Sequence, residues 1–212
     1  MAVAEPRRVL TETFWPAEGA ALLAKRAALV VAGIAFLVIC AKIKVPLWPS
    51  PVAISLGTFA VLTVGAAYGP RLGLVTMLGW MLLGALGFDV FQNSSAEKYG
   101  LAYMMGGTGG YLVGYVLATL ALGFAARRGW DRSVTGMAAA MLIGNALIYI
   151  PGLLWLGHIV EGGLFDPAKY ASVWDQTMAW GLTPFVIGDL LKLALAALVV
   201  PGLWRLVGEA RA

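Results

Sequence analysis

The sequence is poor in charged residues and almost free of cysteine and histidine. Asp, Glu, Lys and Arg make up 12% of its 212 residues, about half the 25% that is typical of soluble domains. Hydrophobic residues reach 60%, and the mean hydropathy is +0.83. Too few polar side chains remain to cover a folded surface in water. The composition therefore predicts an all-α integral membrane protein, because helices satisfy their own backbone hydrogen bonds in lipid.

Reactive residues are equally scarce, and this limits the possible chemistry. Cys40 is the one cysteine and cannot form an intramolecular disulfide, while the lone His158 excludes a site built from several histidines. No Lys-Ser or Lys-Thr follows the glycines of Gly106–Gly110, so the phosphate-binding loop GxxxxGK[ST] is absent. The sequence therefore predicts no catalytic residue, no metal and no cofactor, and it indicates a protein that is not an enzyme.

Six apolar runs are long enough, with their flanks, to cross a bilayer. The turn Tyr68–Arg71 separates the second from the third, because Gly and Pro break a helix there. We expect a single six-helix membrane domain over residues 25–206, an N-terminal segment over 1–24 and a tail over 207–212. The runs are Ala27–Ala41, Val52–Tyr68, Leu72–Phe88, Ala102–Ala126, Val134–Leu156 and Leu182–Leu206.

The basic residues are distributed unequally between the two sides of these six runs. One side, which includes both termini, holds ten Lys and Arg residues, and the other holds four. Because cytoplasmic loops carry the excess of Lys and Arg, we expect both termini in the cytoplasm and the longer loops outside. The ten are Arg7, Arg8, Lys25, Arg26, Arg71, Arg127, Arg128, Arg132, Arg205 and Arg211, and the four are Lys42, Lys44, Lys98 and Lys169.

The last apolar run carries two opposite charges in the stretch PFVIGDLLKLAL. Asp189 and Lys192 are three residues apart and so lie on one face of a helix. If the helix begins at Leu182, Asp189 lies roughly 10 Å deep. Ionisable side chains are costly in lipid, so both should face the bundle interior. They form either a structural ion pair or a ligand site, in which Lys192 binds an anion and Asp189 accepts from N–H groups.

Three further patterns have both a structural and a functional interpretation. Asn145 and Tyr149 share one helix face and could bind a ligand or join helices. The stretch GGTGGYLVGY contains two GxxxG steps, which favour close helix packing, and its glycines also let a ligand approach the backbone. Ala24, Ala28 and Ala32 form a smooth strip for another helix, in this chain or in a partner.

Taken together, five stretches of the chain resemble the BioY family. BioY proteins are the biotin-specific substrate-binding subunits, or S-components, of energy-coupling factor (ECF) transporters. The resemblance covers roughly residues 24–206, and the pairing of GGTGGY with GDLLK is specific. The stretches are AKIKVPLWPSPVAISLGTFAV (Ala41–Val61), YGPRLG (Tyr68–Gly73), GLAYMMGGTGGYLVGY (Gly100–Tyr115), IYIPGLLWL (Ile148–Leu156) and PFVIGDLLKLALAAL (Pro184–Leu198).

The resemblance implies a six-helix S-component bundle in the bacterial cytoplasmic membrane that captures extracellular biotin for uptake. It also implies a transmembrane coupling subunit and two cytoplasmic ATPases as partners, with Ala28 and Ala32 matching the family's docking strip. Biotin has two ureido N–H groups, a carbonyl, a carboxylate and an apolar chain. Asp189 would accept from the N–H groups and Lys192 would donate. The other implied ligand-binding residues are Asn145, Tyr149, Tyr111 and Gly110.

The chain departs from the family pattern at two positions. Gly57 stands where family members often have Gln, and Gly107 stands where they often have Pro. A polar contact made by that Gln could be supplied here by Gln92 or Asn93, and we include Asn93 among the expected site residues.

Four alternatives to ATPase-driven biotin capture stay open at this point. One is a stand-alone carrier of biotin or another small molecule. Another is an ion- or proton-coupled carrier with Asp189 as the relay. An intramembrane enzyme would need Asp189, Lys192 and His158 to act without a recognisable nucleophile. The last is an assembly subunit without a ligand, whose polar residues only join helices.

Overall fold

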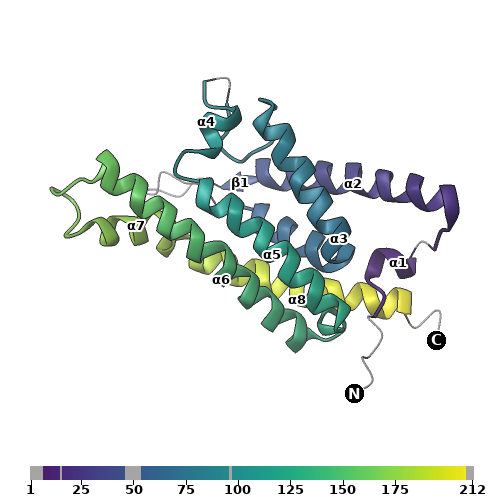
Figure 1. Cartoon of the computed structure of the whole chain (residues 1–212). Coiled ribbons are helices and arrows are strands. Elements are labelled where there is room, and N and C mark those ends of the chain that lie inside the picture. Colours follow the sequence, from purple (N-terminus) through teal and green to yellow (C-terminus); the bar gives the residue numbers. More distant parts are fainter. Residues whose placement is uncertain (1–6, 15, 46–53, 96, 209–212) are drawn as a thin grey trace, which may run out of the picture.

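The protein folds as a bundle of long helices, as the composition predicts (Figure 1). The computed structural model describes residues 7–14, 16–45, 54–95 and 97–208. The connection between the first two predicted runs, Lys42–Pro51, and the tail 207–212 lie partly outside these ranges. The α-helices are α1 (Leu10–Phe14), α2 (Gly19–Lys42), α3 (Gly57–Ala85), α4 (Gly100–Met104), α5 (Gly109–Arg127), α6 (Val134–Ile159), α7 (Val173–Gly181) and α8 (Val186–Gly208).

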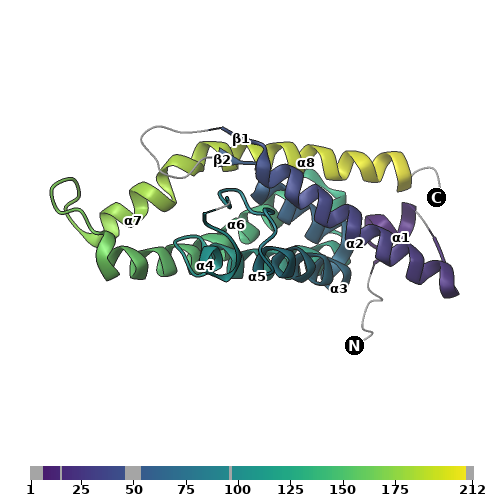
Figure 2. The ribbon, with the colours of Figure 1, turned by 90° about the horizontal axis from the view of Figure 1, so that it is seen from above.

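Short elements connect these helices. Strands β1 (Lys44–Val45) and β2 (Ile54–Ser55) pair antiparallel between α2 and α3. A 3-10 turn at Trp130–Arg132 links α5 to α6, and a π-helical turn at Val160–Leu164 extends α6. In Figure 2, α8 lies along one edge of the bundle, α3 and α5 lie along the other, and α2 crosses diagonally.

The described residues contain five helices that are long and apolar enough to cross a membrane, where the sequence predicted six spans. The difference lies in α3, which joins the second and third predicted runs in one element. At Gly69 the backbone leaves the helical region with φ 75° and ψ 177°, and Pro70 follows. A Cβ placed on Gly73 would lie 3.6 Å from the Cα of Gly65, whereas eight residues of straight helix span about 12 Å. The chain therefore turns back on itself at Gly69, and the two arms of α3 lie side by side.

Glycines allow α5 to lie against its neighbours at backbone distance. A Cβ on Gly114 would be 2.6 Å from the Cα of Ile148 in α6, and one on Gly123 would be 2.4 Å from the nitrogen of Pro70 in α3. The step Gly110–Gly114 thus serves helix packing, as one interpretation of the sequence proposed. This packing holds the N-terminal half of α5 against α6, and both helices contribute residues to the candidate site.

The two groups of basic residues lie at opposite ends of the bundle. At one end the guanidinium of Arg127 binds both carboxylate oxygens of Glu12, at 2.5 and 2.6 Å, which ties α1 to the last turn of α5. At the other end Lys42 pairs with Asp89 at 2.5 Å, and Lys44 donates to the carbonyl of Gln92 at 3.1 Å. This separation is the one that the charge pattern predicts for the inner and outer sides.

A buried carboxylate attaches α8 to the turn between α5 and α6. Asp131 is 1% exposed, and its Oδ2 accepts a hydrogen bond of 2.5 Å from the indole N–H of Trp204 in α8. Within the described residues its Oδ1 has no hydrogen-bond partner. Burial raises the pKa of Asp131 to about 6, against the opposing effect of the Trp204 hydrogen bond. The ionised form is therefore destabilised in the folded protein.

We expect Asp131→Asn to stabilise the protein more at pH 7.5 than at pH 5. An unfolded chain binds this proton only below about pH 4, so the folded state holds more protons between pH 4 and pH 6. Stability therefore falls as pH rises through that window. The amide keeps an acceptor for Trp204 and removes the charge. Thermal unfolding in detergent at both pH values measures the effect, and an equal difference at the two pH values would contradict it.

Trp204→Phe tests the same hydrogen bond from the side of its donor. It removes the N–H donor that stabilises the ionised carboxylate, so its cost should be larger at pH 7.5 than at pH 5. The lost stacking of Arg132 on the indole, at 4.4 Å, should contribute equally at both pH values.

Candidate functional site

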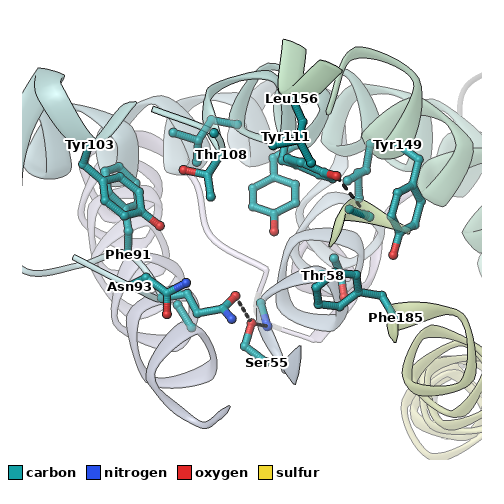
Figure 3. Close-up of a pocket in the computed structure, with 18 of the residues that line it drawn as sticks. Ser55, Thr58, Phe91, Asn93, Tyr103, Thr108, Tyr111, Tyr149, Leu156 and Phe185 are labelled. Atoms are coloured by element: carbon teal, nitrogen blue, oxygen red, sulfur yellow. Dashed lines mark hydrogen bonds between the residues drawn. The ribbon is translucent and has the colours of Figure 1, made fainter. Parts of the chain in front are cut away.

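A cavity of about 310 Å³ lies inside the bundle toward the end that carries Lys42 and Lys44 (Figure 3). This volume is at the lower end of the range for small-molecule sites. Its lining residues come from α2, β2, α3, the segment 91–98, and α4 to α8. It is therefore formed only when nearly the whole chain is folded. It is lined by apolar and aromatic walls with polar groups in two places, which we call the charged pole and the amide pole.

The charged pole consists of Asp189 and Lys192 on α8. Their side chains are only 8% and 10% exposed, and the Lys192 ammonium lies 2.7 Å from Oδ1 of Asp189. The helix start at Leu182 that was expected from the sequence is wrong, because α8 begins at Val186. A 3-10 turn at Thr183–Phe185 precedes α8, so Asp189 lies in its first turn. The break follows from the dihedrals of Leu182 (φ −129°, ψ −59°), which end α7 and start a new helix direction before Pro184.

Two side chains from other helices hold this pair from opposite flanks. From α6, the hydroxyl of Tyr149 donates to Oδ2 of Asp189. From α3, the hydroxyl of Thr58 accepts from Lys192 at 2.9 Å and lies 3.4 Å from Oδ1 of Asp189. A buried ion pair is tolerated only when further hydrogen bonds satisfy its remaining polar groups. Three helices thus fix the orientation of two charges that face the cavity.

The amide pole is formed by the segment that follows α3 together with residues of β1 and β2. The Ser55 hydroxyl donates to Oε1 of Gln92 at 2.9 Å and accepts from the backbone N–H of Gly57 at 3.2 Å. Lys44 reaches Oδ1 of Asn93 at 3.4 Å. Lys98 also lines the cavity. This pole therefore offers amide groups and a positive charge, and none of its side chains named here is acidic.

Aromatic rings form much of the wall between the poles. Trp80 meets Phe91 edge to face at 4.9 Å, and Phe91 stacks on Tyr103 at 5.0 Å. The edge of Tyr111 meets Tyr149 at 6.1 Å, and the Tyr111 hydroxyl donates to the carbonyl of Gly181 at 2.9 Å. Figure 3 shows Tyr103, Tyr111 and Tyr149 on different sides of the cavity. Such rings suit an apolar ligand body with polar ends.

Five of the seven ligand-binding residues predicted from the sequence line this cavity, and two do not. Asn145, one turn from Tyr149 on α6, is not among the lining residues. Gly110 is also absent from the lining, since its Cα faces α6: a Cβ there would lie 2.2 Å from the carbonyl oxygen of Pro151. The five that line it are Asp189, Lys192, Tyr149, Tyr111 and Asn93. The predicted partner residues Ala28 and Ala32 are exposed on α2.

Sequence reasoning missed several polar residues of the cavity. Ser55 and Thr58 lie on either side of Gly57. Their polarity at the start of an otherwise apolar run could have identified them. Tyr103 precedes the glycine cluster Gly106–Gly110, and Thr108 lies within it. Lys98 had no signal beyond its position on the side with fewer basic residues.

Known proteins of one family resemble this chain over most of its length. The BioY family profile matches residues 11–209. The biotin transporter BioY of Thermotoga maritima is 34% identical over 183 residues, which cover 85% of this chain and 98% of that protein. The probable biotin transporter BioY of Pyrococcus horikoshii is 32% identical over 176 residues, which cover 83% of this chain and 94% of that protein.

A solved structure shows the same fold. It is the S-component for biotin from an ECF-type ABC transporter, with a TM-score of 0.69 and 20% identity, and it covers 89% of this chain and 95% of that one. The sequence matches, together with a membrane bundle that encloses a cavity with two polar poles, place this chain in the BioY family.

Proposed function

We propose that this protein is the biotin-binding subunit of a vitamin uptake system and not an enzyme. The observation that carries the proposal is the buried pair Asp189 and Lys192, which faces a cavity sized for a small molecule. Family membership supports biotin as the ligand, because relatives that match most of this chain are named biotin transporters. Burying two charges is costly, and a ligand with complementary polar groups gives them a role.

The charges of the two poles suggest how biotin lies in the cavity. The carboxylate of Asp189 would repel the biotin carboxylate but can accept hydrogen bonds from the ureido N–H groups. Lys192 can donate to the ureido carbonyl beside them. The biotin carboxylate then faces the amide pole, where Lys98 lines the cavity and no acidic residue of the described chain does. The apolar chain between the two ends lies along the aromatic wall.

The same reasoning supports a topology of six membrane crossings with the cavity toward the outside. The two arms of α3 turn at Gly69, so each can cross separately and the five long helices then supply six crossings. The end with Arg127 and Arg132 faces the cytoplasm by the distribution of positive charge. This assigns residues 1–24 and 207–212 to the cytoplasmic side and residues 25–206 to the multi-pass membrane domain.

A direct binding measurement tests this function. Purified wild-type protein should bind biotin with a dissociation constant below about 1 µM, measured by titration calorimetry in detergent or in nanodiscs. An affinity in the millimolar range would contradict the proposal, because capture of a scarce vitamin would then fail.

We also propose an ECF coupling subunit and its ATPases as partners, docked on the α2 face that holds Ala28 and Ala32. Both residues are exposed, and α2 is the least enclosed of the long helices. Small side chains let a partner helix approach its backbone closely. The solved structure with this fold belongs to such an assembly.

Enlarging both alanines should separate binding from assembly. We expect Ala28→Leu with Ala32→Leu to retain biotin binding, since neither residue lines the cavity, and to lose co-purification with the coupling subunit. Ala139→Leu, on the exposed face of α6, is the matched control and should still co-purify. Unchanged co-purification of the double variant would exclude this face as the docking site.

A further inference from the structure

Thr58 lies at a junction that the fold holds in place. It is the second residue of α3, three residues after the end of β2. The N–H of Leu56 donates to the carbonyl of Ile43 at 3.2 Å, and the N–H of Gly57 donates to the Ser55 hydroxyl at 3.2 Å. The β-branched Thr58 side chain has few rotamers. Its hydroxyl is therefore presented at one place relative to α8.

That place lies between the two charges of the site. The Thr58 hydroxyl accepts from the Lys192 ammonium at 2.9 Å, and its own hydrogen can point to Oδ1 of Asp189 at 3.4 Å. The ammonium has three N–H groups. Asp189 takes one at 2.7 Å and Thr58 takes another, so one remains to donate into the cavity that Lys192 lines.

The two flanking hydroxyls act on different members of the pair. Tyr149 donates to Asp189 alone and so orients the acid. Thr58 is the neighbour from another helix that accepts from Lys192 in the described hydrogen bonds. Without it, the long and flexible lysine would have Asp189 as its one anchor, and the ammonium could rotate so that no N–H points to the ligand.

We propose that Thr58 is a positioning residue that sets the affinity for the ligand through Lys192. Its hydroxyl accepts a second N–H of the ammonium, which fixes the orientation of Lys192 beside Asp189 and directs the third N–H toward the ligand. This inference rests on the proposed function, because the ligand used to test it is biotin.

The first measurement compares two substitutions at this position. Thr58→Val keeps the shape but removes the hydroxyl, and we expect biotin affinity to fall about 10-fold, because a hydrogen bond to a charged group is lost. Thr58→Ser keeps the hydroxyl and should retain most of the affinity. The control is Thr63→Val on the same arm of α3, because the Thr63 hydroxyl is buried with no partner among the described residues. The biotin affinity of Thr63→Val should match that of the wild-type protein.

The second measurement asks whether Thr58 acts through Lys192. In a Lys192→Ala background, Thr58→Val should change the affinity less than about 2-fold, since coupled residues are not additive. An equal loss in both backgrounds would overturn the inference, as would full affinity of Thr58→Val in the wild-type background. Failure of the proposed function itself would look different, because wild-type protein would then not bind biotin tightly.

Discussion

Replacing Lys192 with alanine is expected to weaken biotin binding by about 100-fold or more. A hydrogen bond to a charged group contributes about 1.5–3 kcal/mol, and each 1.4 kcal/mol is tenfold in affinity. The variant leaves Asp189, 6% exposed, without its cation and removes the donor for the ureido carbonyl. Titration with biotin measures the loss.

The chain offers a closely matched control for this variant. Lys169 pairs with Asp166 three residues away at 2.9 Å, but its side chain is 74% exposed. Exposed pairs contribute little, so Lys169→Ala should bind biotin as wild type does. Lys192→Ala combined with Asp189→Asn removes both charges, and should fold at least as well as Lys192→Ala while still failing to bind. Tight binding by the double variant would show that the pair is structural.

Gly110→Ala is expected to destabilise the whole bundle. The new Cβ would lie 2.2 Å from the carbonyl oxygen of Pro151 and 2.5 Å from Cβ of Trp155, so α6 would have to move away from α5. Overpacking of this kind costs about 1–3 kcal/mol and sometimes more. Tyr111 and Tyr149 lie on those two helices beside the cavity, so biotin affinity should fall together with the thermal unfolding temperature.

Gly202→Ala on α8 is the control for this substitution. No atom lies within 4 Å of a Cβ placed there, so the extra methyl group should leave stability unchanged or slightly higher. The test also separates the two interpretations of Gly110 made from the sequence. A variant with normal stability and lost binding would support a direct ligand contact, whereas a parallel loss of both supports helix packing.

The sequence alone was sufficient to predict the class of protein, its family and the presence of the charged pair on one helix face. Each of these depends on composition or on short-range spacing, which the fold does not change. A three-residue separation puts Asp189 and Lys192 on one face of any helix, and the cost of charge in lipid directs that face inward. The unequal distribution of Lys and Arg can likewise be counted from the sequence, because the order of the loops along the chain is known.

Only the tertiary structure decided which other side chains meet this pair. Thr58 is 134 residues from Lys192, and Ser55 is 37 residues from Gln92, so no local pattern relates them. The position of a residue within its helix could not be predicted either, since it depends on where each helix starts and how it crosses its neighbours. For that reason Asn145 lies outside the cavity lining while Tyr149, on the same face, lies inside it. Contacts between distant segments decide the site, because the cavity exists only where these helices meet.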